Sequence, residues 1–175
     1  SCIIYCNTRR HTDHVYSMVK DWFPDEVAIC RSNLPDGKRK QNERAFMRGD
    51  RRIMVATSAF GMGVNKADVR LIIHYNLPLS LIDYYQQAGR AGRDGGKARC
   101  ILLYNKSDYD LNRYVIEQNQ EPRALDDSLK ALDAMKEYAD SNKGCMVQRM
   151  LAALGEEMDK PCGRCACCQK ARGHA

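Results

Sequence analysis

The sequence predicts an α/β domain with a parallel sheet, followed by a small α-helical subdomain. Through the first 105 residues, short apolar segments alternate with segments whose apolar residues recur at helical spacing. Short apolar strands separated by helices are typical of a parallel sheet covered on both faces. From residue 121 onward the strand signal stops and only helical periodicity remains. We therefore expect one domain over residues 1–120 and a second over residues 121–175.

Each element follows from a local pattern. The apolar segments predict strands over residues 2–5, 27–29, 52–57, 71–75 and 99–104. Helical periodicity predicts helices over residues 12–22, 35–49, 124–140 and 146–154. Ser80 has the side chain of an N-cap, so a further helix is expected from there to about Ala88.

The composition excludes several classes of protein. The chain has 175 residues, of which 44% are hydrophobic and 29% charged, with a net charge of +6. No apolar stretch approaches the roughly 20 residues of a membrane-spanning helix. The start of the chain lacks the pattern of a secretory signal. With nine cysteines, an odd number, these features argue against a disulfide framework and for an intracellular setting, either cytoplasmic or nuclear.

Positive charge is concentrated in the first part of the chain. Residues 1–120 carry 19 basic and 13 acidic residues, whereas residues 121–175 carry nine of each. Within residues 38–52, seven cations accompany only Glu43 and Asp50. These cations are Lys38, Arg39, Lys40, Arg44, Arg48, Arg51 and Arg52. Such a segment can follow a phosphate backbone, and a solvated helix face is the alternative.

Five of the nine cysteines lie near the end of the chain and predict a zinc site. Four have the spacing of tetrahedral ligands, x16 and then x2 twice: Cys145, Cys162, Cys165 and Cys168. Gly163 suits the tight turn in which backbone amides point at the sulfurs. Cys167 is an alternative to Cys168, although the equal x2 spacings favour Cys168. A set of redox-labile thiols is the competing interpretation. Four protein ligands leave no open position, so the Zn²⁺ is expected to be structural.

The remaining cysteines lie in or beside the apolar segments. They are Cys2, Cys6, Cys30 and Cys100. Free cysteine behaves as a small hydrophobic residue, so these four are expected to pack among apolar side chains.

Two further segments point to phosphate chemistry. Arg90 and Arg93 lie three residues apart, among glycines, at the end of an expected helix. Guanidinium groups stay charged and bind phosphate oxygens bidentately. Upstream, residues 55–70 consist of an expected strand and a Gly-rich loop. The loop follows the carboxyl end of the strand, where α/β sheets bind their ligands.

These segments together resemble the RecQ family of DNA helicases. Residues 3–8 look like motif IV, residues 55–70 like motif V and residues 86–94 like motif VI. The four-cysteine spacing is similar to the family's zinc module, which separates RecQ from other superfamily 2 helicases. The resemblance covers nearly the whole chain. It implies a RecA-like, P-loop-NTPase-type sheet serving as the helicase C-terminal lobe, with ATP-dependent 3′-to-5′ unwinding in DNA replication, recombination and repair.

The resemblance also implies roles for individual residues. The catalytic group is Arg90, Arg93 and Gln86, with one arginine acting as a finger on the γ-phosphate. The nucleotide-binding group is Gly63, Asn65, Asp68, Arg90 and Arg93. The group that holds the backbone of single-stranded DNA is Asn7, Thr8, Arg9, Thr57 and Ser58. Strand-end capping is the alternative role of Thr57 and Ser58.

The chain departs from the family pattern after the second expected strand. Cys30-Arg31-Ser32-Asn33 stands where many relatives have Tyr-His-Ala-Gly, which puts the usual DNA contact there in doubt. No Gly-x4-Gly-Lys-Ser/Thr sequence occurs. The family places that P-loop, with most contacts to ATP and Mg²⁺, in a preceding RecA-like domain. We therefore expect the chain to be a piece of a longer protein and inactive alone.

The expected partners are single-stranded and duplex DNA and that N-terminal RecA-like domain, with no membrane. Two other functions remain open. One is a non-catalytic, zinc-containing nucleic-acid-binding module, and the other is a lobe of a superfamily 2 RNA helicase. The two arginines at motif VI spacing favour a motor over a binding module, and the zinc spacing favours DNA over RNA.

Overall fold

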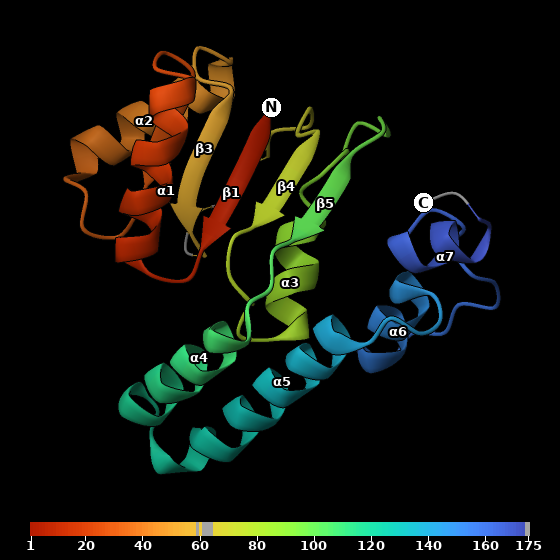
Figure 1. Cartoon of the computed structure of the whole chain (residues 1–175). Coiled ribbons are helices and arrows are strands. Elements are labelled where there is room, and N and C mark those ends of the chain that lie inside the picture. The colour runs from red at the N-terminus through yellow and green to blue at the C-terminus, as the bar shows by residue number, and fades with distance from the viewer. Residues whose placement is uncertain (59, 61–64, 174–175) are drawn as a thin grey trace. The chain divides into compact units, whose positions relative to one another are not determined.

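The computed structural model describes residues 1–58, 60 and 65–173 (Figure 1). Contacts divide the chain into two compact units. The first contains Ser1–Leu77 and Gln86–Asn105, and the second contains Pro78–Tyr85 and the residues from Lys106 onward. The division into domains after residue 120 stays a prediction.

A parallel sheet forms the centre of the first unit. In the described residues its strands are β1 (Cys2–Cys6), β2 (Val27–Cys30), β3 (Ile53–Thr57), β4 (Leu71–His74) and β5 (Arg99–Leu102). Their order is β2-β3-β1-β4-β5, and every neighbouring pair is parallel. The predicted α/β class and strands are confirmed, with ends that differ by at most two residues. Because all strands run the same way, their carboxyl ends meet at one edge.

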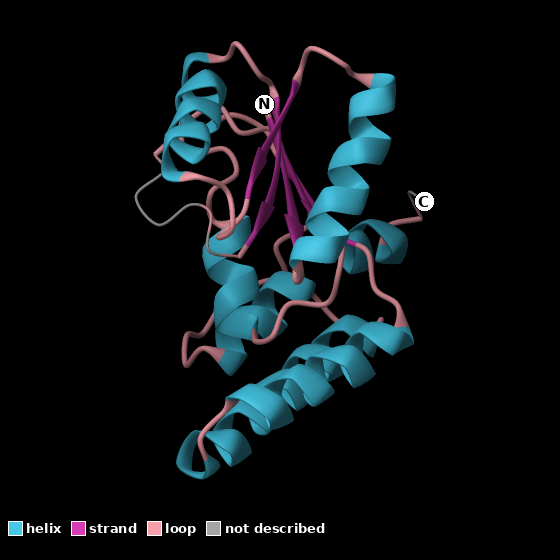
Figure 2. Ribbon diagram, turned by 90° about the vertical axis from the view of Figure 1, so that its left-hand side faces the viewer, coloured by secondary structure: helices cyan, strands magenta, loops and turns pink. Residues whose placement is uncertain are grey.

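Helices cover both faces of this sheet. Successive strand residues point to opposite faces, so each face has its own apolar cluster. On one face, α1 (Arg9–Trp22) contributes Val15 to a buried cluster with Ile4 and Val55. On the other face, α2 (Asp36–Arg48) contributes the fully buried Phe46. Figure 2 shows the sheet edge-on between these helices.

The edge strand β5 differs from the prediction. A sheet buried on both faces was expected, but Arg99, Cys100 and Ile101 are exposed. Position at the sheet edge is not the reason, because β2, the other edge strand, is fully buried under α1 and α2. Among the described residues, no helix covers β5 to a similar extent. Cys6 and Cys30 are buried as predicted and Cys2 is half-buried, whereas the packing prediction for Cys100 was wrong.

The second unit is helical. Its elements include α4 (Lys106–Asn119), α5 (Pro122–Asp140), α6 (Met146–Ala153) and α7 (Ala166–Ala171). The helix α3 (Leu81–Ala88) has residues in both units. Ser80 caps α3 as predicted, since its Oγ accepts a hydrogen bond from Asp83 N at 3.0 Å. None of the helices in the described part of the chain combines the length and apolar character needed to cross a bilayer.

Sequence reasoning missed α4 for a physical reason. Its buried positions are Asp108, Asn112 and Ile116, two of which are polar. Its apolar Leu111 and Tyr114 are instead exposed. An apolar stripe at helical spacing, the signal on which the prediction depends, is therefore absent from the buried side of this helix.

Candidate functional site

The carboxyl edge of the sheet brings together the residues predicted to hold DNA. In the parallel register, Cys6 lies opposite Thr57, so Asn7 and Ser58 follow neighbouring strand ends. The Asn7 amide Nδ2 donates to Leu77 O at 2.6 Å, which ties the end of β1 to the segment after β4.

Beside Asn7, the segment begins a helix. Thr8 is the N-cap of α1, and its Oγ1 accepts a hydrogen bond from His11 N at 3.1 Å. Arg9 and Ser58 are exposed, while Thr57 is buried. The Thr57 carbonyl accepts from Phe60 N at 2.9 Å. Four of the five predicted residues therefore present some accessible surface at one edge of the sheet, apart from the buried Thr57.

Asn76 is a site residue that the sequence reasoning missed. It is buried, and its Oδ1 accepts from Asn7 N at 3.3 Å and lies 3.0 Å from His11 Nδ1. Asn76 thereby holds both the carboxyl end of β1 and the first turn of α1. Its place, two residues after β4, was a signal available in the sequence, because a polar side chain at a strand end is a candidate ligand group.

Motifs V and VI meet through Arg93. Its Nη1 donates to Asn65 Oδ1 at 3.1 Å, and its Nε donates to Gly89 O at 3.3 Å. Two predicted nucleotide-binding residues, separated by 28 positions, are thus in direct contact. Arg93 remains exposed to solvent. The predicted Gly63 lies outside the described residues.

Arg90 has a different environment from Arg93. It is half-buried and lies beside the hydroxyl of Tyr5, a residue of β1. Burial raises the pKa of Tyr5 to about 12, against the lowering effect of the nearby Arg90 and Arg93 guanidinium groups. Arg90 is therefore held against the sheet, while Arg93 is accessible to a ligand from solvent.

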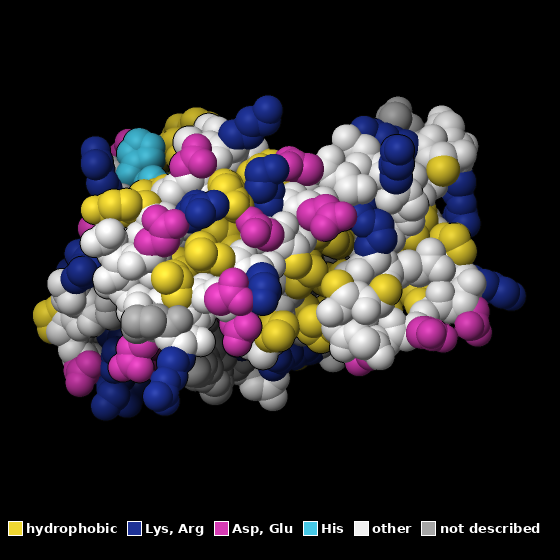
Figure 3. Space-filling model, turned by 90° about the horizontal axis from the view of Figure 1, so that it is seen from below, with side chains coloured by type: hydrophobic (Ala, Val, Ile, Leu, Met, Phe, Trp, Pro, Cys, Tyr) yellow, Lys and Arg dark blue, Asp and Glu magenta, His cyan; other side chains and the backbone are white. Residues whose placement is uncertain are grey.

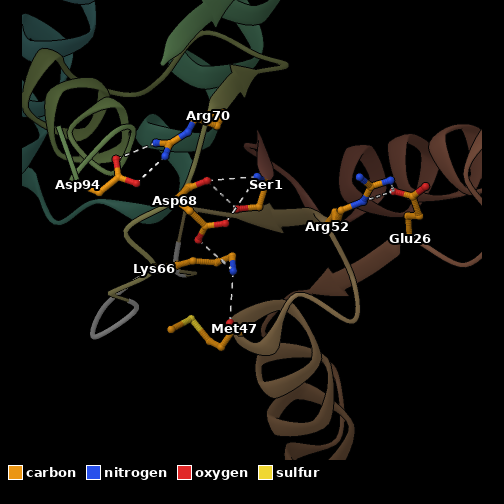
Figure 4. A network of polar contacts seen from close by, with 8 residues as sticks. All are labelled: Ser1, Glu26, Met47, Arg52, Lys66, Asp68, Arg70 and Asp94. Atoms are coloured by element: carbon orange, nitrogen blue, oxygen red, sulfur yellow. Dashed lines mark hydrogen bonds and ion pairs between the residues drawn. The ribbon is translucent and has the colours of Figure 1, made fainter. Parts of the chain in front are cut away.

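Asp68 lies just before β4, at the amino edge of the sheet, opposite the carboxyl ends of the strands. Its carbonyl accepts from Ser1 N, just before β1, and its carboxylate contacts Lys66 Nζ at 3.1 Å (Figure 4). The hydrogen bond from Lys66 holds the pKa of Asp68 below its usual value. Lys66 Nζ also donates to Met47 O at 3.3 Å. The structure thus joins Asn65 to Arg93 but gives Asp68 another partner.

A bidentate ion pair fixes the end of motif VI. Arg70 donates to both carboxylate oxygens of Asp94 at 2.8 and 2.5 Å, as drawn in Figure 4. This pair holds the pKa of Asp94 well below its usual range. Because Gly92 N also donates to Val69 O at 2.9 Å, the loop that carries Arg93 is anchored to the segment before β4.

Gly92→Ala is expected to lower the free energy of unfolding by about 1–3 kcal/mol. Gly92 has φ +64°, and an added Cβ would lie 2.6 Å from Gly96 O. Chemical denaturation measures the change. Gly37→Ala is the matched control, because nothing lies within 4 Å of its added Cβ in α2. That control is expected to stabilise by about 0.5–1 kcal/mol. Equal effects at the two sites would contradict the prediction.

His74 and Gln87 form a buried polar pair beneath motif VI. Both are buried, and the imidazole stacks on Tyr5 with ring centroids 5.6 Å apart. Burial lowers the pKa of His74 to about 4, against the raising effect of hydrogen bonds with Gln87 and Ile101. The predicted Gln86 is exposed, so the neighbouring Gln87 is the glutamine that anchors this helix.

The low pKa of His74 predicts acid destabilisation. The unfolded imidazole, with a pKa of 6.5, binds a proton more readily than the folded one, with a pKa of about 4. Its contribution is therefore present above pH 6.5 and is lost as the pH falls toward 4, by up to about 3 kcal/mol. Denaturation at a series of pH values should show a flatter acid limb for His74→Gln. The same change at the exposed His14 should leave the fall in stability at acid pH unchanged. If stability depends on pH in the same way in His74→Gln as in the unchanged chain, the prediction is wrong.

The four predicted zinc ligands converge in the second unit. The Sγ atoms of Cys145, Cys162, Cys165 and Cys168 all lie within 4.8 Å of one another. The Sγ atoms of Cys145 and Cys165 are 3.9 Å apart. Zn–S bonds of about 2.3 Å in a tetrahedron place the sulfurs about 3.8 Å apart, so this spacing fits zinc. A disulfide, with sulfurs about 2.05 Å apart, does not fit it.

Backbone amides surround the sulfurs, as predicted for the turn that contains Gly163. Cys165 N donates to Cys162 Sγ at 3.3 Å, and Cys162 N donates to Cys145 Sγ at 3.2 Å. Desolvation raises the pKa of Cys145, but hydrogen bonds from Cys162, Gln148 and Cys168 outweigh it and lower the pKa to about 6. Such donors favour thiolates, the form that binds metal. Cys167 lies outside the cluster and lines a depression beside it.

Comparisons with known proteins agree with this fold and with a zinc-binding module at its end. Residues 1–95 match the family described as helicase conserved C-terminal domain, and residues 106–169 match the family described as RecQ zinc-binding. A solved structure of the E. coli DEAD-box protein SrmB has a TM-score of 0.55 at 22% identity, covering 69% of this chain and 71% of that chain. The first unit is thus the RecA-like C-terminal lobe of a helicase.

The curated relatives indicate which family of helicases the chain belongs to. The ATP-dependent DNA helicase RecQ of Bacillus subtilis is 36% identical over 97% of this chain and 28% of its own length. A putative ATP-dependent RNA helicase of Acanthamoeba polyphaga mimivirus is 36% identical over 96% of this chain and 30% of its own length. The chain belongs to the RecQ family of helicases. It spans less than a third of the length of these relatives.

Proposed function

We propose that this chain is the second motor lobe of an ATP-dependent, 3′-to-5′ DNA helicase of RecQ type. The observation that carries the proposal is the 3.1 Å contact between Arg93 and Asn65, which joins motif VI to motif V. A module that only binds nucleic acid does not require a guanidinium held in this way. An intracellular location follows from the same proposal.

In this proposal, Arg93 supplies positive charge to the γ-phosphate of ATP. ATP and Mg²⁺ are held mainly by the first RecA-like domain, and ATP supplies the phosphoryl group that is transferred to water. A guanidinium stabilises the negative charge that develops during this transfer. Asn65 orients the Arg93 fork, and Arg90 and Tyr5 hold the loop on the sheet. Gln86, which is exposed, contributes to coupling between nucleotide and domain closure.

The carboxyl edge of the sheet is the proposed contact with single-stranded DNA. Asn7, Thr8, Arg9 and Ser58 supply amide, hydroxyl and guanidinium donors there, and the buried Thr57 supports the end of β3 behind them. Donors of this kind bind phosphate oxygens without reading bases. Asn76 positions Asn7 through its hydrogen bond to the Asn7 backbone. In the second unit, Cys145, Cys162, Cys165 and Cys168 are the proposed ligands of one structural Zn²⁺, and residues 121–175 the proposed zinc-binding domain.

The test is ATP hydrolysis in a chimera. In the RecQ chimera, this chain replaces the matching segment of the Bacillus subtilis relative. We expect hydrolysis that single-stranded DNA stimulates, together with separation of the strands of a 3′-tailed duplex. A chimera that binds DNA and contains zinc but does not hydrolyse ATP would favour the non-catalytic binding module instead.

RNA is the second candidate substrate, and the name of the mimivirus relative favours it. The RecQ chimera distinguishes the two. Stimulation of ATP hydrolysis by single-stranded DNA but not by RNA of the same sequence supports the DNA helicase. Stimulation by RNA alone would assign the lobe to an RNA helicase.

A further inference from the structure

The outward face of α2 carries a row of cations. Lys40, Arg44 and Arg48 follow one another at i, i+4 spacing, which places their side chains on one face of a helix. All three are exposed, whereas Phe46 on the other face is buried against the sheet. We call these three residues the α2 stripe. At a rise of about 1.5 Å per residue, the stripe extends about 12 Å along the helix axis.

The α2 stripe has little compensating negative charge. In the described residues, no ion pair involves Lys40 or Arg44, and Arg48 pairs with Asp50 just beyond the helix. The two acidic residues of α2 are engaged elsewhere. Asp36 pairs with Arg39, and Glu43 accepts from Cys30 Sγ. The outward face therefore keeps a net positive charge.

The cations of the second unit differ from the α2 stripe. Lys130 and Lys136 on α5 pair with carboxylates four residues away at 2.5 and 2.7 Å, and Arg113 on α4 pairs with Glu117 at 2.9 Å. Figure 3 shows charges of both signs interspersed over one face of the molecule, seen from below. A row of one sign, such as the α2 stripe, is what a polyanion binds.

We propose that the α2 stripe binds the phosphate backbone of duplex DNA. This inference rests on the proposed helicase function and adds a second contact, distinct from the strand ends that hold the single strand. The side chains of the stripe include no aromatic ring on which an unpaired base can stack. Binding to single strands uses such rings, whereas duplex DNA presents one charge per about 1.7 Å and needs only cations.

Salt-dependent binding of the 175-residue chain tests the proposal. The probes are a fluorescein-labelled blunt duplex and one of its strands, and anisotropy is followed from about 50 to 200 mM salt. The Lys40→Gln, Arg44→Gln, Arg48→Gln triple variant should bind the duplex at least about tenfold more weakly. Its slope of log K against log salt should become shallower by about 2–3, since each duplex phosphate contact contributes about 0.9.

The matched control removes the same amount of charge elsewhere. It is the Arg113→Gln, Lys130→Gln, Lys136→Gln triple variant, in which every substituted cation is ion-paired in the unchanged chain. Duplex binding by this control should change by less than about twofold. An equal loss in the two variants would mean that net charge alone acts, and this overturns the proposal. So does undiminished duplex binding by the stripe variant, or no duplex binding by the unchanged chain.

A second variant separates this proposal from the helicase function. Asn7→Ala with Arg9→Ala should weaken single-strand binding, and the stripe variant should leave it nearly unchanged. If the Asn7→Ala, Arg9→Ala variant weakens binding to the duplex or the single strand and the stripe variant weakens neither, the α2 proposal fails and the helicase proposal stands. Circular dichroism of every variant checks that the fold is intact, above all for Asn7→Ala, which removes the hydrogen bond to Leu77 O.

Discussion

Arg93→Ala is expected to lower DNA-stimulated ATP hydrolysis by the RecQ chimera about 10³- to 10⁵-fold, the range for loss of an arginine finger. The structure leaves the Arg93 guanidinium exposed and oriented by Asn65 at 3.1 Å, whereas Arg90 lies beside Tyr5. Arg93→Lys should also be strongly impaired. Lysine keeps the charge but lacks the planar fork that binds two oxygens at once.

Steady-state hydrolysis and DNA anisotropy, measured on the same samples, separate chemistry from binding. DNA affinity should stay within about twofold, because one lost cation removes at most one phosphate contact. Arg99→Ala is the matched control, since Arg99 is exposed on β5 and is likewise a single cation of the first unit. Hydrolysis by Arg93→Ala at the rate of the Arg99→Ala control would rule out a role for Arg93 at the γ-phosphate.

Removal of zinc is expected to unfold the end of the second unit. Elemental analysis should find one zinc per chain. A strong chelator should then expose four additional reactive thiols of the nine and remove helical signal by circular dichroism. Structural zinc contributes about 10–16 kcal/mol to folding in zinc-finger peptides. Here it joins α6, whose N-cap is Cys145, to α7, which contains Cys168.

Single cysteine variants test which thiols are the ligands. Cys145→Ser and Cys168→Ser should lose zinc and helical signal. Cys167→Ser should keep both, because Cys167 lies outside the cluster of four sulfurs. Cys100→Ser, at an exposed position of the first unit, is the general control for loss of a thiol. A chain that is fully folded without bound metal would contradict the zinc prediction. Reaction of all nine thiols after denaturation would show that no disulfide holds the fold in place of zinc.

The sequence by itself determined the strands, the helices other than α4 and α7, the parallel sheet, the family and the four cysteines that converge. These are local properties. Apolar periodicity reports which residues face a core, and the x2 spacing in Cys162–Cys165 confines two sulfurs to one turn. A motif likewise carries its identity in consecutive residues, as in residues 86–94.

The tertiary structure alone decided which of these residues meet. It placed Asp68 with Lys66 rather than with Arg93, and it introduced Asn76 and Gln87, whose importance depends on partners distant in sequence. It also revealed α4, whose buried face is largely polar. Contacts and burial depend on neighbours that the chain brings together only when it folds. A pattern of residue types along the chain can propose a site, whereas the packing of β1, β3 and β4 determines how its residues are oriented.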